Sequence, residues 1–435
     1  MSIFTQDMVA VLGFVALFAL LALRVPIGIS LGAVGVIGLG LVIGTSPALN
    51  LLSMSPLASA TNLDFAVVPL FILMGVVVRR AGISQELFQA CSAWLGRFRG
   101  GLAMATVGAC GLFGAICGSS VATAATMSRI AYPEMEREGY APRYAAGSIA
   151  AGGTLGVLIP PSVPMVLYGI ITENDIGKLF VAGIVPGIVA VVLYFVAVRL
   201  IAAFKPDAIP VGRSSSFAEK VQSLRGVWSA VVIFLLVIGG MYGGLFTALE
   251  AAAAGAFASM ILAFMRRRIN ITEAIEALTE SVRLSASLFV VLIGAILFGS
   301  FLVITGAPQR VSEVLVQLPL SPLGILCVIL AAFVLLGAVL DTIAMIIIAV
   351  PIVYPTMVEL GIDPIWFGIL VVVVSEIGLI TPPYGMNVFV INGTIPKVSI
   401  VEVFRGVMPF VGIDLLRLAI LVAFPGITLW LTAGM

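Results

Sequence analysis

Histidine is absent from the 435-residue sequence. Its absence excludes Ser-His nucleophilic sites, HExxH zinc sites and histidine proton relays, because each of these needs an imidazole. Cysteine is scarce as well. Cys91, Cys110, Cys117 and Cys327 show no paired metal spacing, and most of them lie in apolar stretches. We therefore interpret the four cysteines as small apolar packing residues without a metal or disulfide role.

Charged residues are the second scarce class. Only 10% of the residues are charged whereas 61% are hydrophobic, which is more apolar surface than a soluble protein of this size can bury. The net charge of +1 leaves no basic surface for nucleic acid. The composition therefore indicates that the lipid bilayer surrounds most of the chain, and it argues against a nucleic-acid partner.

The segment before the first apolar run has no basic residue. It reads MSIFTQDMVA and carries only Asp7 as a charge, whereas a cleavable signal peptide starts with a basic region. We expect this first run to stay as a membrane helix with its N-terminus on the outer, periplasmic side.

The apolar runs indicate an all-α polytopic membrane protein, since a crossing helix needs about 20 mostly apolar residues. About ten full crossings are predicted, near residues 8–23, 26–44, 65–80, 143–171, 176–203, 226–245, 248–265, 284–304, 364–392 and 406–432. Two further stretches, 101–131 and 321–357, are each long enough for two short helices and have a polar or glycine break at the centre. We interpret them as re-entrant helical hairpins.

The basic residues support this topology. With the N-terminus outside, nearly every Lys and Arg beyond the crossings falls on the cytoplasmic side, as the positive-inside rule requires. Lys178 and Arg310 fall outside, and Arg417 lies within the last crossing. The same count places hairpin one on the cytoplasmic side and hairpin two on the outer side.

An internal repeat is visible at a constant offset of 222 residues. Its matches fall on residue types that are rare in apolar chains, namely Tyr132-Pro133 with Tyr354-Pro355, Gly156 with Gly378, and Pro160-Pro161 with Pro382-Pro383. Five crossings separate the two copies, so the second copy is inverted. Inverted repeats with broken helices are typical of secondary transporters, whose sites lie near the midplane where the copies meet.

The repeat suggests a division of the chain. Residues 1–64 are expected to form N-terminal scaffold helices, 65–175 repeat one, and 176–283 central scaffold helices with a cytoplasmic linker at 204–225. Residues 284–395 form repeat two, and 396–435 a C-terminal scaffold helix. Residues 81–100 and 305–319 have the pattern of interfacial amphipathic helices, although a plain loop explains the second equally well.

Each repeat has two backbone interruptions, a hairpin tip (114–120 or 337–342) and a Pro-Pro break (152–162 or 375–387). A Pro-Pro pair removes two amide donors and frees carbonyl groups upstream. Such groups are costly at membrane depth unless they line a cavity or bind an ion. Freed carbonyls with Ser or Thr hydroxyls suit sodium, and the N-termini of the following half-helices suit a carboxylate. The pattern predicts about two cation sites with an anion between them.

A few charged residues lie within the apolar stretches, where each is costly and therefore a functional candidate. Asp341 at the tip of hairpin two either faces the site or caps a half-helix. Glu376 is interpreted as fixing the broken helix through hydrogen bonds rather than binding an ion. Asp414 and Arg417 are three residues apart and are expected to pair with each other.

At the two broken helices the chain resembles a known family. The segments GTLGVLIPPSVPMVLYG (153–169) and SEIGLITPPYGMNVFVINGT (375–394) are similar to the large membrane subunit of tripartite ATP-independent periplasmic (TRAP) transporters. GSSVATAATM (118–127), TALEAAAAGAF (247–257) and LDTIAMIIIAVPIVYP (340–355) fit the same family, so the likeness covers nearly the whole chain. Ala248, in the expected scaffold, departs from the family's proline at that position.

The resemblance implies a permease of the bacterial inner membrane that works with a small four-helix membrane subunit and a periplasmic solute-binding protein. It implies sodium-driven import of a small organic acid, such as a C4-dicarboxylate, another carboxylate or a sialic acid. It also implies an elevator-type fold, in which hairpins and broken helices slide against a scaffold. No cofactor is expected, and sodium is the coupling ion.

The resemblance also assigns residues to sites. The first sodium site draws on Ser119, Ser120, Gly156 and Pro160, and the second on Gly337, Asp341, Gly378 and Thr381. Substrate meets the half-helix tips near Ser162, Thr342, Tyr384 and Asn387.

Three other functions remain open from the sequence. The chain could be a stand-alone secondary carrier of the same superfamily, without a binding protein. It could be a channel, although an inverted repeat with midplane breaks favours alternating access. An intramembrane hydrolase would need two facing acids, and Asp341 and Asp414 are the only fair pair.

Overall fold

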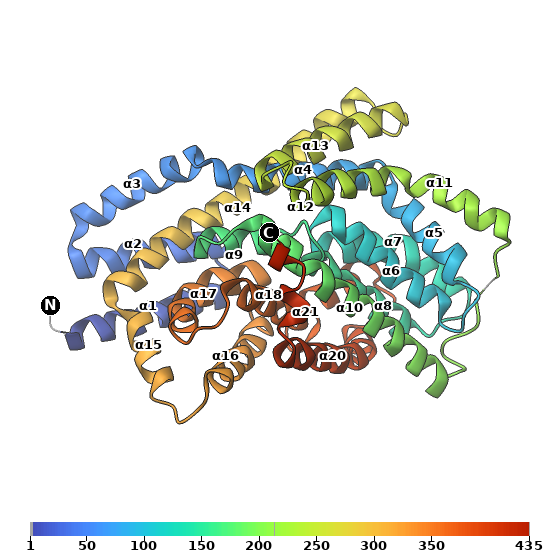
Figure 1. Ribbon diagram of the computed structural model, residues 1–435. Helices are drawn as coiled ribbons and strands as arrows, with labels where there is room; N and C mark the ends of the chain where they lie inside the picture. Colours follow the sequence, from blue (N-terminus) through green and yellow to red (C-terminus); the bar gives the residue numbers. More distant parts are fainter. Residues whose placement is uncertain (1–2, 213, 435) are drawn as a thin grey trace.

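The computed structural model describes residues 3–212 and 214–434. Within these ranges the chain is helical and has no named strand, apart from an isolated β-bridge between Arg99 and Val211 (Figure 1). Many large apolar side chains are exposed, among them Val11, Ile37 and Leu41. A surface of this kind suits lipid rather than water, so the chain is a multi-pass membrane protein.

One group of helices, which we call the scaffold group, packs mainly within itself. It consists of α1 (Ile3–Ala22), α2 (Ile27–Ile43), α3 (Thr45–Thr61), α4 (Val67–Arg80), α13 (Ala248–Met265) and α14 (Ile271–Thr305). The closest pair is α2 and α14, where a Cβ atom on Gly35 would lie 2.6 Å from the carbonyl carbon of Leu297. Glycine allows this approach because it has no side chain, as in many membrane helix pairs.

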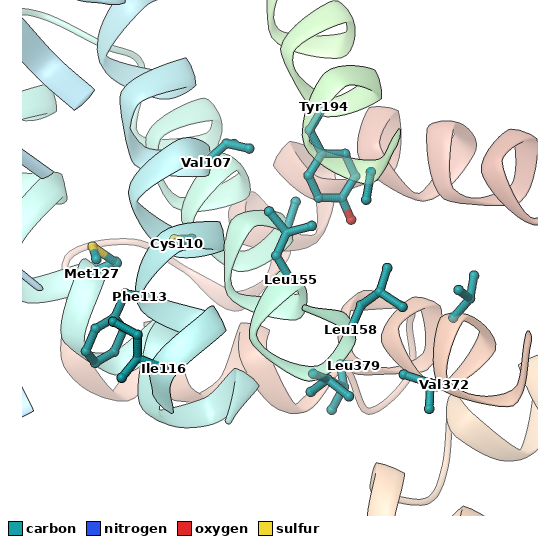
Figure 2. Packing of buried hydrophobic residues seen from close by; sticks show 14 of the residues in the cluster. Val107, Cys110, Phe113, Ile116, Met127, Leu155, Leu158, Tyr194, Val372 and Leu379 are labelled. Atoms are coloured by element: carbon teal, nitrogen blue, oxygen red, sulfur yellow. The ribbon is translucent and has the colours of Figure 1, made fainter. Parts of the chain in front are cut away.

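The second group, which we call the hairpin group, contains both interrupted regions. Its first half is α6 (Gly101–Cys117), α7 (Ser120–Arg137), α8 (Pro142–Leu158), α9 (Val163–Thr172) and α10 (Ile176–Phe204). Its second half is α16 (Pro322–Gly337), α17 (Thr342–Glu359), α18 (Pro364–Ile380), α19 (Met386–Thr394) and α20 (Ile400–Ala423). Side chains of both halves form one apolar core, which Figure 2 shows between Phe113, Leu155, Tyr194, Val372 and Leu379.

The helices stop at all four interruptions that the sequence predicts. The hairpins break between α6 and α7 and between α16 and α17, and the Pro-Pro breaks separate α8 from α9 and α18 from α19. Each Pro-Pro break has a cis peptide bond, at Pro160-Pro161 and Pro382-Pro383. The two copies therefore share the cis bond, whereas the N-cap of the following half-helix is extended at Ser162 and left-handed at Gly385.

The remaining elements lie between the helices of the two groups or after α20. They are η1 (Leu63–Ala66), α5 (Ile83–Leu95), α11 (Phe217–Phe234), the π-helical η2 (Leu235–Gly239), α12 (Gly240–Tyr242), α15 (Ala307–Val316), α21 (Gly426–Leu429) and η3 (Thr432–Gly434). The expected amphipathic segments are the helices α5 and α15, so residues 305–319 are not a plain loop. Both helices are tied to the scaffold group by ion pairs, Glu86 to Arg266 and Arg310 to Asp7.

The predicted count of ten crossings is not confirmed. Seven described helices are long and apolar enough to cross a membrane, or eight if the bent pair of α3 with η1 and α4 counts as one span. The apolar helices α2 and α18 have only 17 residues each, because loops or breaks end them early. Conversely, α17 has 18 residues and the length of a span, although the sequence predicts it as a hairpin arm.

Two boundaries drawn from the sequence differ from the ends of the helices. The linker between the halves is shorter than 204–225, since α10 ends at Phe204 and α11 starts at Phe217 with a Ser216 capping box. The division between residues 283 and 284 falls inside α14, which is continuous over 35 residues. The first turns of α14 are charged and precede its apolar run. Hydropathy detects only the apolar run, so it misses the start of this helix. No helix was expected over 45–61, where α3 lies, because its serines interrupt the apolar pattern.

Candidate functional site

A cavity of about 700 Å³ lies at the boundary between the scaffold and hairpin groups. The scaffold side is lined by α4 and α14, through residues such as Gly75, Arg79, Glu280 and Leu288. The opposite side is formed by both hairpin tips and by the starts of α9 and α19. Its surface is mainly apolar with a few polar groups, which is typical of small-molecule sites.

The N-termini of two helices meet this cavity in matched fashion. Ser119 caps α7 by accepting a hydrogen bond from the amide of Ala122, at 3.3 Å. Asp341, 222 residues later, caps α17 by accepting from the amide of Ala344, at 3.1 Å. Ser119, Ser120, Asp341 and Thr342 all line the cavity. Two positive helix ends therefore face one space, an arrangement that favours an anion.

The predicted first sodium site lies where hairpin one meets the break after α8. A Cβ atom on Gly156 would lie 2.9 Å from the Ser119 carbonyl oxygen and 2.8 Å from Thr123 Oγ1. A Cβ atom on Gly118 would lie 2.7 Å from the Pro161 carbonyl oxygen. The absence of side chains at both glycines lets these oxygens converge on the break, as a hard cation requires. Pro160 lies in the same break and is buried.

The predicted second sodium site has the same construction. A Cβ atom on Gly378 would overlap the backbone of Gly337, so the two glycines are in close contact. A cavity of about 30 Å³ lies beside them, lined also by Asp341 and Tyr384. About 10–15 Å³ suffices for one water-sized occupant. Thr381 does not line this space, and its hydroxyl donates to the Ile377 carbonyl at 2.6 Å.

The four predicted substrate residues occupy different places. Thr342 lines the large cavity, and its buried hydroxyl oxygen has no hydrogen-bond partner. Tyr384 is exposed and lines the small cavity instead. Ser162 is buried and caps α9 through the amide of Met165, at 3.4 Å. Of the four, Thr342 therefore has the placement most suited to contact with a substrate.

Asn387, the fourth of these residues, is fully buried between the two repeats. Its Nδ2 donates to Ser120 Oγ at 2.7 Å and to the Ala150 carbonyl at 3.1 Å. Asn387 thus ties the second half-helix to the tip of hairpin one. Ser120 in turn has its hydroxyl occupied by Asn387 at 3.0 Å while still lining the cavity.

A buried charge cluster lies away from both cavities. Arg417 Nη2 donates to Glu376 Oε2 at 2.6 Å and lies 3.1 Å from Asp414 Oδ1, which confirms the predicted pairing of Asp414 with Arg417. Tyr194 donates to Asp414 Oδ2 at 2.7 Å and lies 3.2 Å from the hydroxyl of Thr154. The cluster links α8, α10, α18 and α20 and supports a structural role for Glu376.

The acids that a hydrolase would need are not brought together. Asp341 lines the large cavity, whereas Asp414 is completely buried in the charge cluster beside Arg417. Two facing carboxylates are therefore not available to one substrate.

Other side chains of the site were not identified from the sequence. Thr123 reaches the first sodium site, and Arg79, Arg129 and Glu280 line the large cavity. A signal for α7 is present, since Ser119, Thr126 and Arg129 recur at helical spacing and give this helix a narrow polar face.

Three of the four cysteines have the packing role expected of them, since Cys110 is buried and Cys91 and Cys117 are half-buried against the core, whereas Cys327 is exposed. Cys110 lies in the apolar core, and burial raises the pKa of the Cys91 thiol on α5 to about 12. No cluster of three or more acidic or cysteine side chains that could hold a metal exists among the described residues.

A solved structure has a similar fold. The Alcanivorax borkumensis YdaH transporter, described as having an unusual topology, superposes with a TM-score of 0.64 over 90% of this chain and 89% of that chain. The sequence identity is 16%, so the likeness concerns the fold alone.

Closer similarity is found at the level of sequence. The chain is 35% identical to the C4-dicarboxylate TRAP transporter large permease protein DctM of Pseudomonas aeruginosa, over 89% of this chain and 92% of that protein. It is 29% identical to the sialic acid TRAP transporter large permease protein SiaM of Vibrio cholerae, over 95% and 96%. Both relatives are named as transport permeases, and the chain is not an enzyme.

A family model covers almost the whole chain. The model for the DctM component of the tripartite ATP-independent periplasmic transporter matches residues 14–427, which include both hairpins and both Pro-Pro breaks. The chain therefore belongs to the family of large permease components of TRAP transporters.

Proposed function

We propose that this chain is the membrane-embedded permease of a sodium-coupled transporter that imports a small organic acid across the bacterial inner membrane. The convergence of the α7 and α17 N-termini on one cavity carries this proposal. Ser119 and Asp341 cap these helices, and the remaining amide groups of the first turns offer positive partial charge to a carboxylate.

The coupling ions are assigned to the two glycine contacts at the breaks. Gly156 meets oxygens of hairpin one, and Gly378 meets the backbone of Gly337 in hairpin two. Sodium prefers oxygen ligands, and these sites offer carbonyls with a hydroxyl or a carboxylate nearby. An ion at either place would hold a hairpin tip against its broken helix, so sodium binding organises the walls of the anion cavity.

An elevator-type motion is supported by the location of the cavity. One wall belongs to the scaffold group and the other to the hairpin group. Movement of the hairpin group along α4 and α14 would carry the cavity contents across the membrane. The short helices α5 and α15 connect the scaffold group to hairpin one and to hairpin two, respectively, as a moving domain requires.

The transported molecule and the partners follow from the relatives. C4-dicarboxylates and sialic acid are the substrates named for two similar permeases, and both carry a carboxylate. A small four-helix membrane subunit and a periplasmic binding protein are proposed as partners, since the family is tripartite by name. The binding protein would deliver the acid to the outer face.

Reconstitution tests this proposal. The chain would be placed in proteoliposomes with and without the candidate small subunit, and radiolabelled succinate would be added with and without the binding protein. Uptake that needs all three components and an inward sodium gradient is the expected result. Equal uptake in potassium would contradict sodium coupling, and uptake by the chain alone would establish the stand-alone carrier instead.

A further inference from the structure

Arg129 is the charged side chain of the large cavity that has no charged partner in the described chain. Four charged residues line this space: Arg79, Arg129, Glu280 and Asp341. Arg79 forms an ion pair with Glu280, which also binds Arg80, and Asp341 caps α17. Arg129 is exposed, and the ion pairs of its helix and its neighbours do not include it.

The geometry of α7 relates Arg129 to the hairpin tips. Ser120 starts α7 and Arg129 lies nine positions later, about 14 Å along the helix axis. Both residues line the same cavity. Arginine side chains in helices lean toward the N-terminus of their own helix, so the guanidinium of Arg129 extends back toward the tip. The axial separation of about 14 Å, shortened by the length of an arginine side chain, leaves room for a short, extended anion.

The start of α17, which also lines the cavity, offers groups that can bind a second part of the same anion. Thr342 Oγ1 is a buried hydroxyl without a partner, and its side chain is 7% exposed. It stands at the first position of α17, where the helix dipole is positive. A hydroxyl and a helix end can hold one acidic group, and a guanidinium can hold another with two parallel hydrogen bonds.

We infer that Arg129 binds the second acidic group of a substrate that has one such group at each end, the first being held at the N-termini of α7 and α17. This inference rests on the proposed function and specifies its substrate class. Arg129 is then the residue by which the permease itself distinguishes a diacid from a monoacid of the same length. Asp341 does not oppose this, because sodium in the second site would offset its charge.

The test uses the purified full-length chain in lipid nanodiscs with sodium. Thermal unfolding is followed while succinate or butyrate is titrated, because these acids share four carbons and differ in one carboxylate. The wild type should show a higher apparent affinity for succinate. Arg129→Gln should weaken the apparent affinity for succinate about tenfold or more, toward the value for butyrate, because a charge-assisted hydrogen bond is lost. Arg129→Lys should fall between the two, since lysine keeps the charge without the planar fork.

Arg137→Gln is the matched control, because Arg137 lies on the same helix, is exposed and pairs with Glu134. It should leave the preference for succinate unchanged. Equal affinities of the wild type for the two acids, or a preference that survives Arg129→Gln, would overturn the inference. Stabilisation by sodium over potassium without any acid is measured in parallel. If that stabilisation is present, only the role of Arg129 falls; if it is absent, the sodium-coupled function falls as well.

Discussion

The two Pro-Pro breaks share a sequence pattern and a cis peptide bond, yet their surroundings differ. At break one, Pro160, Pro161 and Ser162 are all buried. At break two, Pro382 and Pro383 are exposed, and Tyr384 is 56% exposed where Ser162 is 1% exposed. A repeated sequence therefore determines where a helix stops, but the neighbouring helices determine whether the break is accessible.

Helix α10 explains the burial of break one. A Cβ atom on Gly183 would lie 2.9 Å from the Leu158 carbonyl oxygen, and one on Gly187 would lie 2.8 Å from the Ile159 side chain. These two glycines form a small-xxx-small pair that lets α10 pack directly on the break. The contact that break two receives is different, since Phe404 of α20 approaches Gly385 with its ring.

The breaks differ in charge as well. Thr154 in repeat one and Glu376 in repeat two are matched positions, 222 residues apart. Thr154 needs only a hydroxyl partner, which Tyr194 supplies at 3.2 Å. Glu376 is fully buried and needs a cation, which Arg417 supplies. Repeat two thus depends on an ion pair that repeat one does not have.

Among the changes considered, removal of Arg417 should reduce the stability of the protein most. Arg417→Leu leaves Glu376 and Asp414 buried without their cation, and loss of one partner of a buried pair costs about 3–5 kcal/mol. We expect a strong fall in the thermal unfolding temperature of the purified protein. Thr154→Val, the matched change in repeat one, removes a neutral hydrogen bond and should cost about 1 kcal/mol.

The double variant Arg417→Leu/Glu376→Thr gives repeat two the residue of repeat one. It should recover part of the stability lost in Arg417→Leu, because the uncompensated carboxylate of Glu376 is gone. A double variant no more stable than Arg417→Leu would show that the cost does not come from the carboxylate of Glu376, and it would assign the cost to the unpaired Asp414 and to the lost packing of the arginine stem.

Substitution of the glycines at the two breaks should also lower stability more in repeat two than in repeat one, but by less than the loss of Arg417. Gly378→Ala places a methyl group against the Gly337 backbone, whereas Gly156→Ala meets the Thr123 side chain and one carbonyl oxygen. A side chain can move more easily than a backbone, so Gly378→Ala should cost about 1–3 kcal/mol and Gly156→Ala less. Both should weaken the sodium-dependent stabilisation, which a titration of unfolding temperature against sodium measures. Equal effects would show that both contacts are equally rigid.

Replacing the cap of hairpin two by that of hairpin one should distinguish the contribution of the Asp341 charge to sodium binding from its contribution to helix capping. Asp341→Ser gives hairpin two the cap of hairpin one, and both residue types cap helices well. Stability without sodium should therefore change by less than about 0.5 kcal/mol. The apparent affinity for sodium should fall about tenfold, or about 1.4 kcal/mol, if the carboxylate contributes to the second site. Unchanged sodium affinity would remove Asp341 from that site.

Much of this comparison could be predicted from the sequence, because proline and glycine act on their own backbone. Pro160-Pro161 and Pro382-Pro383 identify both breaks, and a Ser or Asp at a hairpin tip identifies each cap. The charge of Arg417 was linked to Asp414 by spacing on one helix. Its stronger contact with Glu376 joins α20 to α18, and no local pattern reveals a partner 41 residues away.

Arg129 and the burial of break one were not predictable for the same reason. The hydropathy count treats Arg129 as a cytoplasmic charge, while its place in a cavity depends on how α7, α4 and α14 pack together. The length-based count of crossings failed where breaks shorten a helix, as at the end of α18. Sequence patterns thus predict the effect of a residue on its own helix, whereas the neighbours of that helix depend on tertiary packing.

Cysteine labelling should measure how far the two breaks differ in accessibility to water, and it should change stability least. In a variant whose four native cysteines are replaced by alanine, Tyr384→Cys should react rapidly with a water-soluble maleimide, because this position is exposed. Ser162→Cys should stay unlabelled until the protein is denatured, because this position is buried. Adding Gly183→Ala should displace α10 from Leu158 and make Ser162→Cys reactive. If Ser162→Cys labels as fast as Tyr384→Cys without that change, break one opens to water on its own, and the two breaks differ in the state they occupy rather than in how they are covered.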